Sequence, residues 1–337
     1  MNGSRVDATV LIATYNRAAL LDETLASLRR LQVRPGTRWE AIVVDNNSTD
    51  ATRETIQRHA ADFPVPLTYL FEQRQGRSSA LNAGLAAARG RVLAFTDDDV
   101  RVAAGWLQAA IDTLAEPGGY AYAGGPVRPI WEVPPPRWLD TTRGDLWGTI
   151  AIQDHGREPF DYDARRKVPL GANMATTAEL FEIAGAFRAD LGRTGGTQVL
   201  GQEVPELLIR ARAAGLRGCY VPQMEVEHHI PARRLTPAYF TRWWYGKGLS
   251  RAALERMQPI TEMGVDLRRT PHVLGVPRYM YGSAARDVLG CVRNALAGRP
   301  ADAFRHRMML AYFRGYFAAR QGERRTYRTE KVVSTGR

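Results

Sequence analysis

The chain has 337 residues, of which 45% are hydrophobic and 24% charged, and it carries a formal net charge of +11. This length exceeds that of a typical single domain, and the composition is that of a globular protein. Its two cysteines cannot form a disulfide framework or a zinc finger, which favours a reducing compartment. We find no signal-peptide pattern and no apolar run of the ~18–20 residues that span a bilayer, so we expect a cytoplasmic protein.

The positive charge is concentrated in the last third of the chain. Residues 232–337 contain 21 lysines and arginines against 7 acidic residues, a net charge of +14, whereas residues 1–231 carry −3. Such a segment suits nucleic acid, an anionic membrane or a phosphorylated substrate, and it also suits a plain solvated helical surface. We see no nucleic-acid recognition motif and expect no nucleic-acid partner.

Strand-like and helix-like patterns alternate through the first hundred residues. We predict strands over residues 8–16, 39–45, 66–72 and 91–97, and helices over residues 19–31, 51–61 and 78–89. This alternation predicts a largely parallel sheet covered by helices, that is, an α/β fold. Further along, residues 168–187 predict a strand and then a helix, residues 201–214 a helix that stops at Gly215, and residues 217–231 strands. Beyond Pro237 the pattern is mainly helical.

We therefore divide the chain into three parts. Residues 1–231 form the predicted catalytic domain, residues 232–322 a basic and mainly helical segment, and residues 323–337 a flexible tail. In the helical segment, apolar stripes such as Val288, Leu289, Val292 and Leu296 suit either packing on the catalytic domain or contact with an anionic leaflet.

Polar residues follow three of the four predicted strands. They are Thr14, Tyr15 and Asn16 after the first strand, Asp45 and Asn46 after the second, and Asp97, Asp98 and Asp99 after the fourth. Ligands of such sheets bind at the carboxyl ends of the strands, so we expect one site there.

The aspartate run has two interpretations. Residues two apart on an extended chain point the same way, so Asp97 and Asp99 can face one Mg²⁺ or Mn²⁺ ion while Asp98 turns aside. The alternative is a solvated acidic turn.

Five segments, in order, resemble family 2 glycosyltransferases of the GT-A type. They are VLIATYNRAALLDETLASL, VVDNNSTDAT, ALNAGLAAARGRVLAFTDDDV, GANMATTAELFEIAGAF and VPQMEVEHH. The resemblance covers roughly residues 6–231. It implies a Rossmann-like, mostly parallel sheet flanked by helices, and a hexosyltransferase-like enzyme that moves a sugar, with inversion, from a UDP- or GDP-linked donor to an acceptor hydroxyl.

The resemblance also implies roles for the donor site. Thr14, Tyr15 and Asn16 would line the nucleotide pocket, Asp45 would hold the base or ribose, and Arg74, Arg77 and Asn82 would face the nucleotide. Asp99 would bind the metal directly, Asp97 would contact ribose or the metal shell, and Asp98 would lie within the same donor site.

An inverting transfer needs a general base near the acceptor hydroxyl. The family usually supplies it from a GED-like element, and this chain reads GQEVPE instead. Alignment of that helix points to Glu203 as the base with Glu206 behind it, whereas Val204 stands where a second acid is common. The alternative is that Glu203 only caps its helix.

Two further residues match positions near the donor in the family. Asn173 would line the donor-sugar or acceptor pocket, with Gly171 allowing close approach of the backbone. His228 would lie near the diphosphate or the metal, although a single histidine is more often structural.

We therefore predict a metal-dependent inverting glycosyltransferase, peripheral on the inner face of the membrane or free in the cytoplasm, that acts in cell-envelope, polysaccharide or glycolipid synthesis. A nucleotidyltransferase is a second hypothesis, which the absence of a Gly-rich basic loop after the first strand disfavours. A degenerate transferase domain that binds nucleotide or an anionic polymer is a third.

Overall fold

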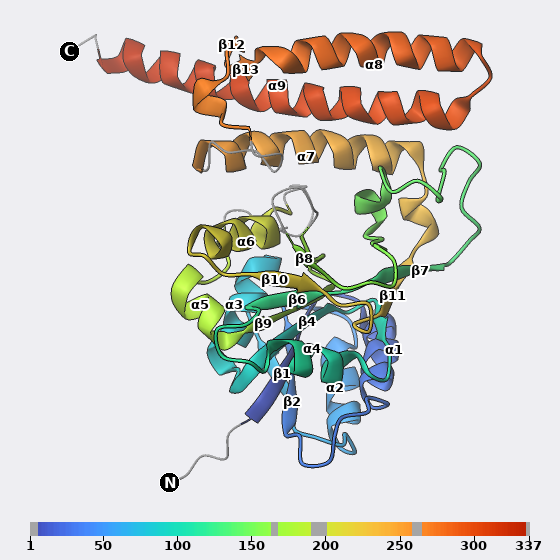
Figure 1. The fold of residues 1–337 in the computed structure, drawn as a ribbon, viewed down its shortest axis with the longest axis vertical. Coiled ribbons are helices and arrows are strands. Elements are labelled where there is room, and N and C mark those ends of the chain that lie inside the picture. The colour runs from blue at the N-terminus through green and yellow to red at the C-terminus, as the bar shows by residue number, and fades with distance from the viewer. Residues whose placement is uncertain (1–5, 163–167, 190–200, 258–264, 335–337) are drawn as a thin grey trace. The chain divides into compact units, whose positions relative to one another are not determined.

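The computed structural model describes residues 6–162, 168–189, 201–257 and 265–334. The chain divides into two compact units (Figure 1). The first takes in the described residues between 1 and 132, 150 and 196, and 203 and 230; the second takes in those between 133 and 149, 197 and 202, and 231 and 337. We call them the catalytic unit and the helical unit.

An eight-stranded sheet forms the centre of the catalytic unit, with strand order β3-β2-β1-β4-β9-β6-β10-β8. The first four strands are parallel, β9 runs antiparallel to both β4 and β6, and β8 is antiparallel to β10. The predicted mostly parallel α/β sheet is thus confirmed. Its strands are β1 (Val6–Thr14), β2 (Trp39–Asp45), β3 (Leu67–Phe71), β4 (Gly90–Asp97), β6 (Tyr122–Gly124), β8 (Phe160–Tyr162), β9 (Asn173–Thr177) and β10 (Gly218–Tyr220).

A smaller sheet joins the segment after β4 to later parts of the chain. Its order is β5-β11-β7, with β11 parallel to β7 and antiparallel to β5. Its strands are β5 (Val100–Val102), β7 (Val127–Trp131) and β11 (Val226–Ile230). The helices of the catalytic unit are α1 (Ala18–Leu28), α2 (Thr52–Ala60), α3 (Arg77–Ala87), α4 (Trp106–Leu114), α5 (Ala178–Ala184) and α6 (Glu203–Ala213).

The large sheet is buried on both faces, because successive side chains of a strand point to opposite sides. Val10 and Ile12 of β1 pack with α1, α2 and α4, whereas Leu11 packs with α3, α5 and α6. The helix ends follow local chemistry: Thr177 caps α5 by accepting a hydrogen bond from the Leu180 N–H, and Gly215 follows α6 with a φ of +82°.

The helical unit contains α7 (Pro237–Met257), α8 (Arg278–Leu296) and α9 (Pro300–Ser334), together with a hairpin of β12 (His272–Val273) and β13 (Val276–Pro277). Short 3₁₀ helices are η1 (Trp147–Ile150), η3 (Ala232–Arg234) and η4 (Leu267–Arg269). α9 continues past Gly322 to Ser334, and the flexibility of the tail expected over residues 323–337 stays a prediction. Residues 335–337 of that expected tail lie outside the described residues.

Close approach of α7 and α9 holds the helical unit together. A Cβ atom on Gly248 would lie 2.1 Å from the carbonyl oxygen of Tyr312, and one on Gly315 would lie 2.0 Å from that of Tyr245. The buried Glu255 carboxylate then accepts hydrogen bonds from the Tyr316 hydroxyl (2.7 Å) and from Arg251 Nε (2.8 Å). Among the described residues, no helix is sufficiently long and apolar to cross a membrane.

We predict that Gly248→Ala destabilises the helical unit by about 1–3 kcal/mol, because the added methyl group meets a backbone oxygen that cannot move aside as a side chain would. Gly282→Ala on α8 is the matched control, since nothing lies within 4 Å of its added Cβ atom. The control should stabilise the protein by up to ~1 kcal/mol through helix propensity. Thermal and denaturant unfolding followed by circular dichroism measure both variants, and equal unfolding midpoints would contradict the close packing.

Candidate active site

The strand ends that the sequence singled out lie side by side. Thr14 of β1 is in register with Asp45 of β2, and Ala13 is in register with Asp97 of β4. The carboxyl ends of three parallel strands therefore meet at one edge of the sheet, as expected for strands of this fold.

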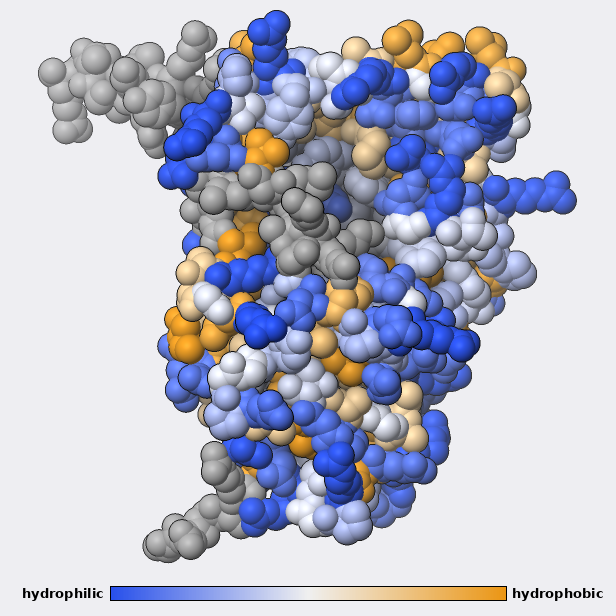
Figure 2. Space-filling view, viewed as in Figure 1, coloured by the Kyte–Doolittle hydropathy of each residue, from blue (hydrophilic) through white to orange (hydrophobic). Residues whose placement is uncertain are grey.

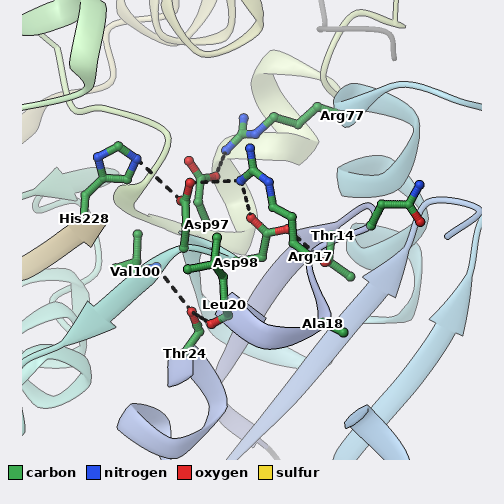
Figure 3. A network of polar contacts seen from close by, with 12 residues as sticks. Thr14, Arg17, Ala18, Leu20, Thr24, Arg77, Asp97, Asp98, Val100 and His228 are labelled. Atoms are coloured by element: carbon green, nitrogen blue, oxygen red, sulfur yellow. Dashed lines mark hydrogen bonds and ion pairs between the residues drawn. The ribbon is translucent and has the colours of Figure 1, made fainter. Parts of the chain in front are cut away.

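The acidic run is neutralised in part by an arginine from the loop after β1. Arg17 Nη1 lies 2.7 Å from Asp98 Oδ1 and 2.9 Å from Asp99 Oδ2 (Figure 3). Both carboxylates are buried, whereas the Arg17 side chain keeps 30% of its surface exposed. Sequence reasoning missed Arg17, although it directly follows the three polar residues at the end of the first predicted strand.

The expectation that Asp98 turns aside was wrong. Asp98 Oδ2 accepts a hydrogen bond from the Thr14 hydroxyl (2.8 Å). Arg17 donates to both Asp98 and Asp99, so these two carboxylates share a partner, rather than Asp97 and Asp99. The physical reason is that β4 ends at Asp97 and the next two residues form a turn. Strand alternation therefore does not apply beyond Asp97.

A second arginine connects Asp97 to the candidate base. Arg77, the first residue of α3, donates to Asp97 Oδ1 (2.7 Å), to Glu203 Oε1 (3.0 Å) and to the carbonyl of Gly171 (3.1 Å). A Cβ atom on Gly171 would lie 2.9 Å from Arg77 Nη2, so the glycine makes room for the guanidinium. One partly buried side chain, 19% exposed, thereby joins the end of β4 to the start of α6.

The two candidate acids of α6 differ in their surroundings. Glu203 Oε1 is bound to Arg77, whereas its buried Oε2 atom has no hydrogen-bond partner among the described residues. Glu206 is held by Arg210 one turn later through two contacts of 2.9 and 2.7 Å. Val204, where a second acid was expected, is buried in the core that covers the α3 side of the sheet.

Burial and the neighbouring arginines shift the pKa values of Asp97 and Asp98 in opposite directions. Burial raises the pKa of Asp98 to about 6, an effect that Arg17 opposes and Asp99 reinforces. Burial also opposes ionisation of Asp97, but the positive charge of Arg77 holds the pKa of that carboxyl below its usual value. The cluster is therefore stable only with its arginines or with other cations.

The loops after β1 and β2 are fastened to each other. Asn16, with a φ of +51°, accepts the Thr49 N–H (2.7 Å), and its own N–H donates to the Ser48 hydroxyl (2.9 Å). Asp45 is buried and accepts from the Ser48 N–H (2.9 Å) and the Tyr69 hydroxyl (3.1 Å). These contacts hold the two loops together along the same edge of the sheet.

The remaining predicted donor-site residues divide into two that are exposed and one, Asn82, that is held by backbone contacts. Tyr15 is 42% exposed, and the Arg74 side chain is 79% exposed and pairs with Glu72. Asn82, by contrast, exchanges two hydrogen bonds with the backbone of Phe187.

Asn173 is fully buried. Its amide nitrogen donates to the carbonyls of Pro126 and Met224, and its oxygen accepts from the Trp106 indole. These contacts connect strands and helices, so they build the scaffold around the site.

His228 of β11 reaches the acidic turn from the smaller sheet. Its Nε2 atom lies 3.5 Å from Asp99 Oδ1, and the neighbouring His229 N–H donates to the Asp99 carbonyl (2.9 Å). Two donors in adjacent positions around one divalent cation lie about 3 Å apart, so this pair fits a metal ion. Among the described residues, no three His, Cys, Asp or Glu side chains group closely enough to hold a metal by themselves.

A model of the glycosyl transferase family 2 matches residues 9–178. The chain belongs to this family. This glycosyltransferase is 27% identical over 244 residues to the succinoglycan biosynthesis protein ExoM of Rhizobium meliloti (strain 1021), a match that covers 72% of this chain and 73% of ExoM. It is 29% identical over 231 residues to the validoxylamine A glucosyltransferase of Streptomyces hygroscopicus subsp. jinggangensis, covering 62% of this chain but only 52% of that one.

The fold of the glycosyltransferase has solved counterparts. The mannosyltransferase PcManGT from Pyrobaculum calidifontis, solved in complex with GDP-Man and Mn²⁺, superposes with a TM-score of 0.59 at 21% identity, over 92% of this chain and 86% of that one. This similarity confirms the GT-A architecture that the sequence predicted.

We predict that Arg17→Ala lowers the free energy of unfolding by roughly 2 kcal/mol or more at pH 8, because it leaves two buried carboxylates without their shared counter-ion. Arg74→Ala is the comparison, since its ion pair with Glu72 is largely exposed and should contribute below about 1 kcal/mol. Denaturant unfolding in the presence of EDTA measures both, and similar small losses would mean that Arg17 does not balance the cluster.

Proposed function

We propose that the protein is a metal-dependent, inverting glycosyltransferase that moves a sugar from a nucleoside-diphosphate donor to an acceptor hydroxyl. The observation that carries the proposal is the connection made by Arg77. It keeps the candidate base, Glu203, within two hydrogen bonds of Asp97 at the acidic strand end. Donor-binding and proton-accepting groups thereby belong to one hydrogen-bonded network, which disfavours a degenerate, purely binding domain.

The donor side of the proposal rests on the sheet edge. Asp45, Tyr15 and Asn16 would receive the nucleoside, and exposed Arg74 is free to turn from Glu72 toward a phosphate. Asp99 and His228 would hold Mn²⁺ or Mg²⁺, with Asp97 in its outer shell. The bound ion would supply Lewis-acid stabilisation of the departing diphosphate.

The acceptor side rests on Glu203. Its Oε2 atom can take a proton because Arg77 occupies only the other oxygen. Arg77 is then a positioning residue that fixes the base relative to the donor. Glu206, held by Arg210, supports the helix behind it and is the second candidate base.

For the acceptor and the location we propose a polysaccharide, lipid-linked or small-molecule hydroxyl, handled in the cytoplasm or on the inner face of the membrane. The names of relatives support this range. ExoM is a succinoglycan biosynthesis protein, and a Campylobacter jejuni relative, 31% identical over 117 residues, is named for an undecaprenol-linked acceptor. The positive charge of the helical unit favours the membrane surface.

We predict that Asp99→Asn weakens Mn²⁺-dependent binding of GDP and UDP by about 100-fold, since a metal ligand is lost. Calorimetric titration with and without EDTA measures this. Asp112 lies on α4 and forms an exposed ion pair with Arg34, so Asp112→Asn should leave the affinity for GDP and UDP unchanged. Unaltered nucleotide affinity in Asp99→Asn would remove that residue from the metal site.

We predict that Glu203→Gln retains donor binding within about twofold but lowers transfer by about 10²–10⁴-fold, because the amide keeps a hydrogen bond to Arg77 and cannot accept a proton. Turnover and the anomeric configuration of the product, followed by NMR, are the readouts. If Glu203→Gln turns over at nearly the wild-type rate, Glu206 or another group is the base.

A further inference from the structure

The C-terminal half of α8 turns its leucines and valines outward, whereas Met280 near the start of the helix is buried. Leu296 is 85% exposed, Leu289 70%, Val292 55% and Val288 49%. With 3.6 residues per turn these four side chains fall on one side of the helix. We call them the α8 outer face. Figure 2 shows hydrophobic residues gathered along the outer edge of the helical unit, over the C-terminal half of α8.

The opposite side of α8 is packed with small and polar groups. A Cβ atom on Gly290 would lie 2.4 Å from His306, so the helix approaches α9 closely there. Asn294 is buried beside it, and Asp287 pairs with His306 Nδ1 at 2.8 Å. The usual arrangement, with leucine and valine inside, is therefore reversed, which points to an apolar partner outside the described fold.

The surroundings of the outer face are positively charged. Residues 278–322 contain eight arginines and two aspartates, a net charge of +6. Arg286 and Arg293, two turns apart, are both exposed and lie along one side of the apolar stripe, next to Leu289. An apolar stripe bordered by cations is the arrangement by which an amphipathic helix lies in the surface of an anionic membrane.

We propose that the α8 outer face docks the enzyme onto an anionic lipid bilayer, with α8 lying in the plane of the membrane surface. Leu289 and Leu296 would enter the boundary between headgroups and acyl chains, and Arg286 and Arg293 would face lipid phosphates. The inference rests on the proposed membrane association and assigns it to one surface; it does not depend on the chemistry of the donor site.

A second copy of the chain is the less favoured occupant. A two-fold contact would bring the same face of each copy together and set arginines against arginines. Four side chains on one helix also cover much less than the ~800 Å² per partner that a stable dimer buries. Charge complementarity favours the bilayer.

The test uses the full-length protein and sedimentation with vesicles of pure phosphatidylcholine or of phosphatidylcholine with phosphatidylglycerol. Leu289→Ser/Leu296→Ser should lower partitioning onto the anionic vesicles about 10- to 100-fold, because the two apolar side chains that would enter the bilayer are lost. Ile183→Ser on α5, an apolar residue that is 48% exposed and lies outside the helical unit, should bind as the wild type does. Arg286→Ala/Arg293→Ala should weaken binding and its dependence on salt.

Each outcome decides the inference. The docking proposal would be overturned if the wild type does not bind anionic vesicles, or if it binds neutral vesicles equally well. It would also be overturned if the double-leucine variant binds anionic vesicles as the wild type does. A concentration-dependent dimer that the double-leucine variant abolishes would assign the face to a second copy instead. Donor hydrolysis measured in the same samples keeps the two proposals separate, since a failed docking surface leaves that activity intact.

Discussion

The site depends on charge balance at the end of β4. Three consecutive aspartates are gathered at this point, and two of them are buried, so their mutual repulsion and desolvation must be offset within the fold. Arg17 offsets Asp98 and Asp99, and Arg77 offsets Asp97. Because Arg17 follows β1 and Arg77 begins α3, this balance also fixes the two loops that border the site. The same interactions thus stabilise the fold and shape the site.

Sharing of the cations has a functional consequence. Arg77 divides its hydrogen bonds among Asp97, Glu203 and the carbonyl of Gly171, which come from three distant parts of the chain. A change in charge at Asp97 therefore alters the hydrogen bond between Arg77 and Glu203. A shift of α6 likewise alters the hydrogen bond between Arg77 and Asp97. The donor end and the acceptor end of the proposed reaction are coupled through one guanidinium, whose planar fork suits several simultaneous acceptors better than a lysine would.

Much of this arrangement could be predicted from the sequence, and the rest follows from geometry that one sequence does not contain. Apolar runs ending in polar residues predict the parallel strands and the edge where Thr14, Asp45 and Asp97 meet, because strand periodicity and fold rules are local or general. The pairings of Arg17 and Arg77 depend on how turns bend the chain. Asp98 illustrates this. Strand alternation predicts that its side chain faces away from the site, whereas the turn after β4 directs it toward Thr14 and Arg17. Asn173 likewise carries a family motif, yet its contacts with Trp106 become evident only once strands and helices are packed.

The helical unit follows a different rule. Its interior tolerates a buried Glu255 because Tyr316 and Arg251 satisfy the carboxylate, and its helices approach closely at glycines such as Gly248. These contacts add to an apolar cluster of Ala252, Val276, Met280 and Tyr316, and the leucines and valines of the C-terminal half of α8 do not belong to it. The apolar stripes of the sequence were consistent with either packing or membrane contact, and the leucines and valines of α8 lie exposed rather than packed between helices. Together with the positive charge of the same segment, this supports the proposed contact with an anionic membrane surface.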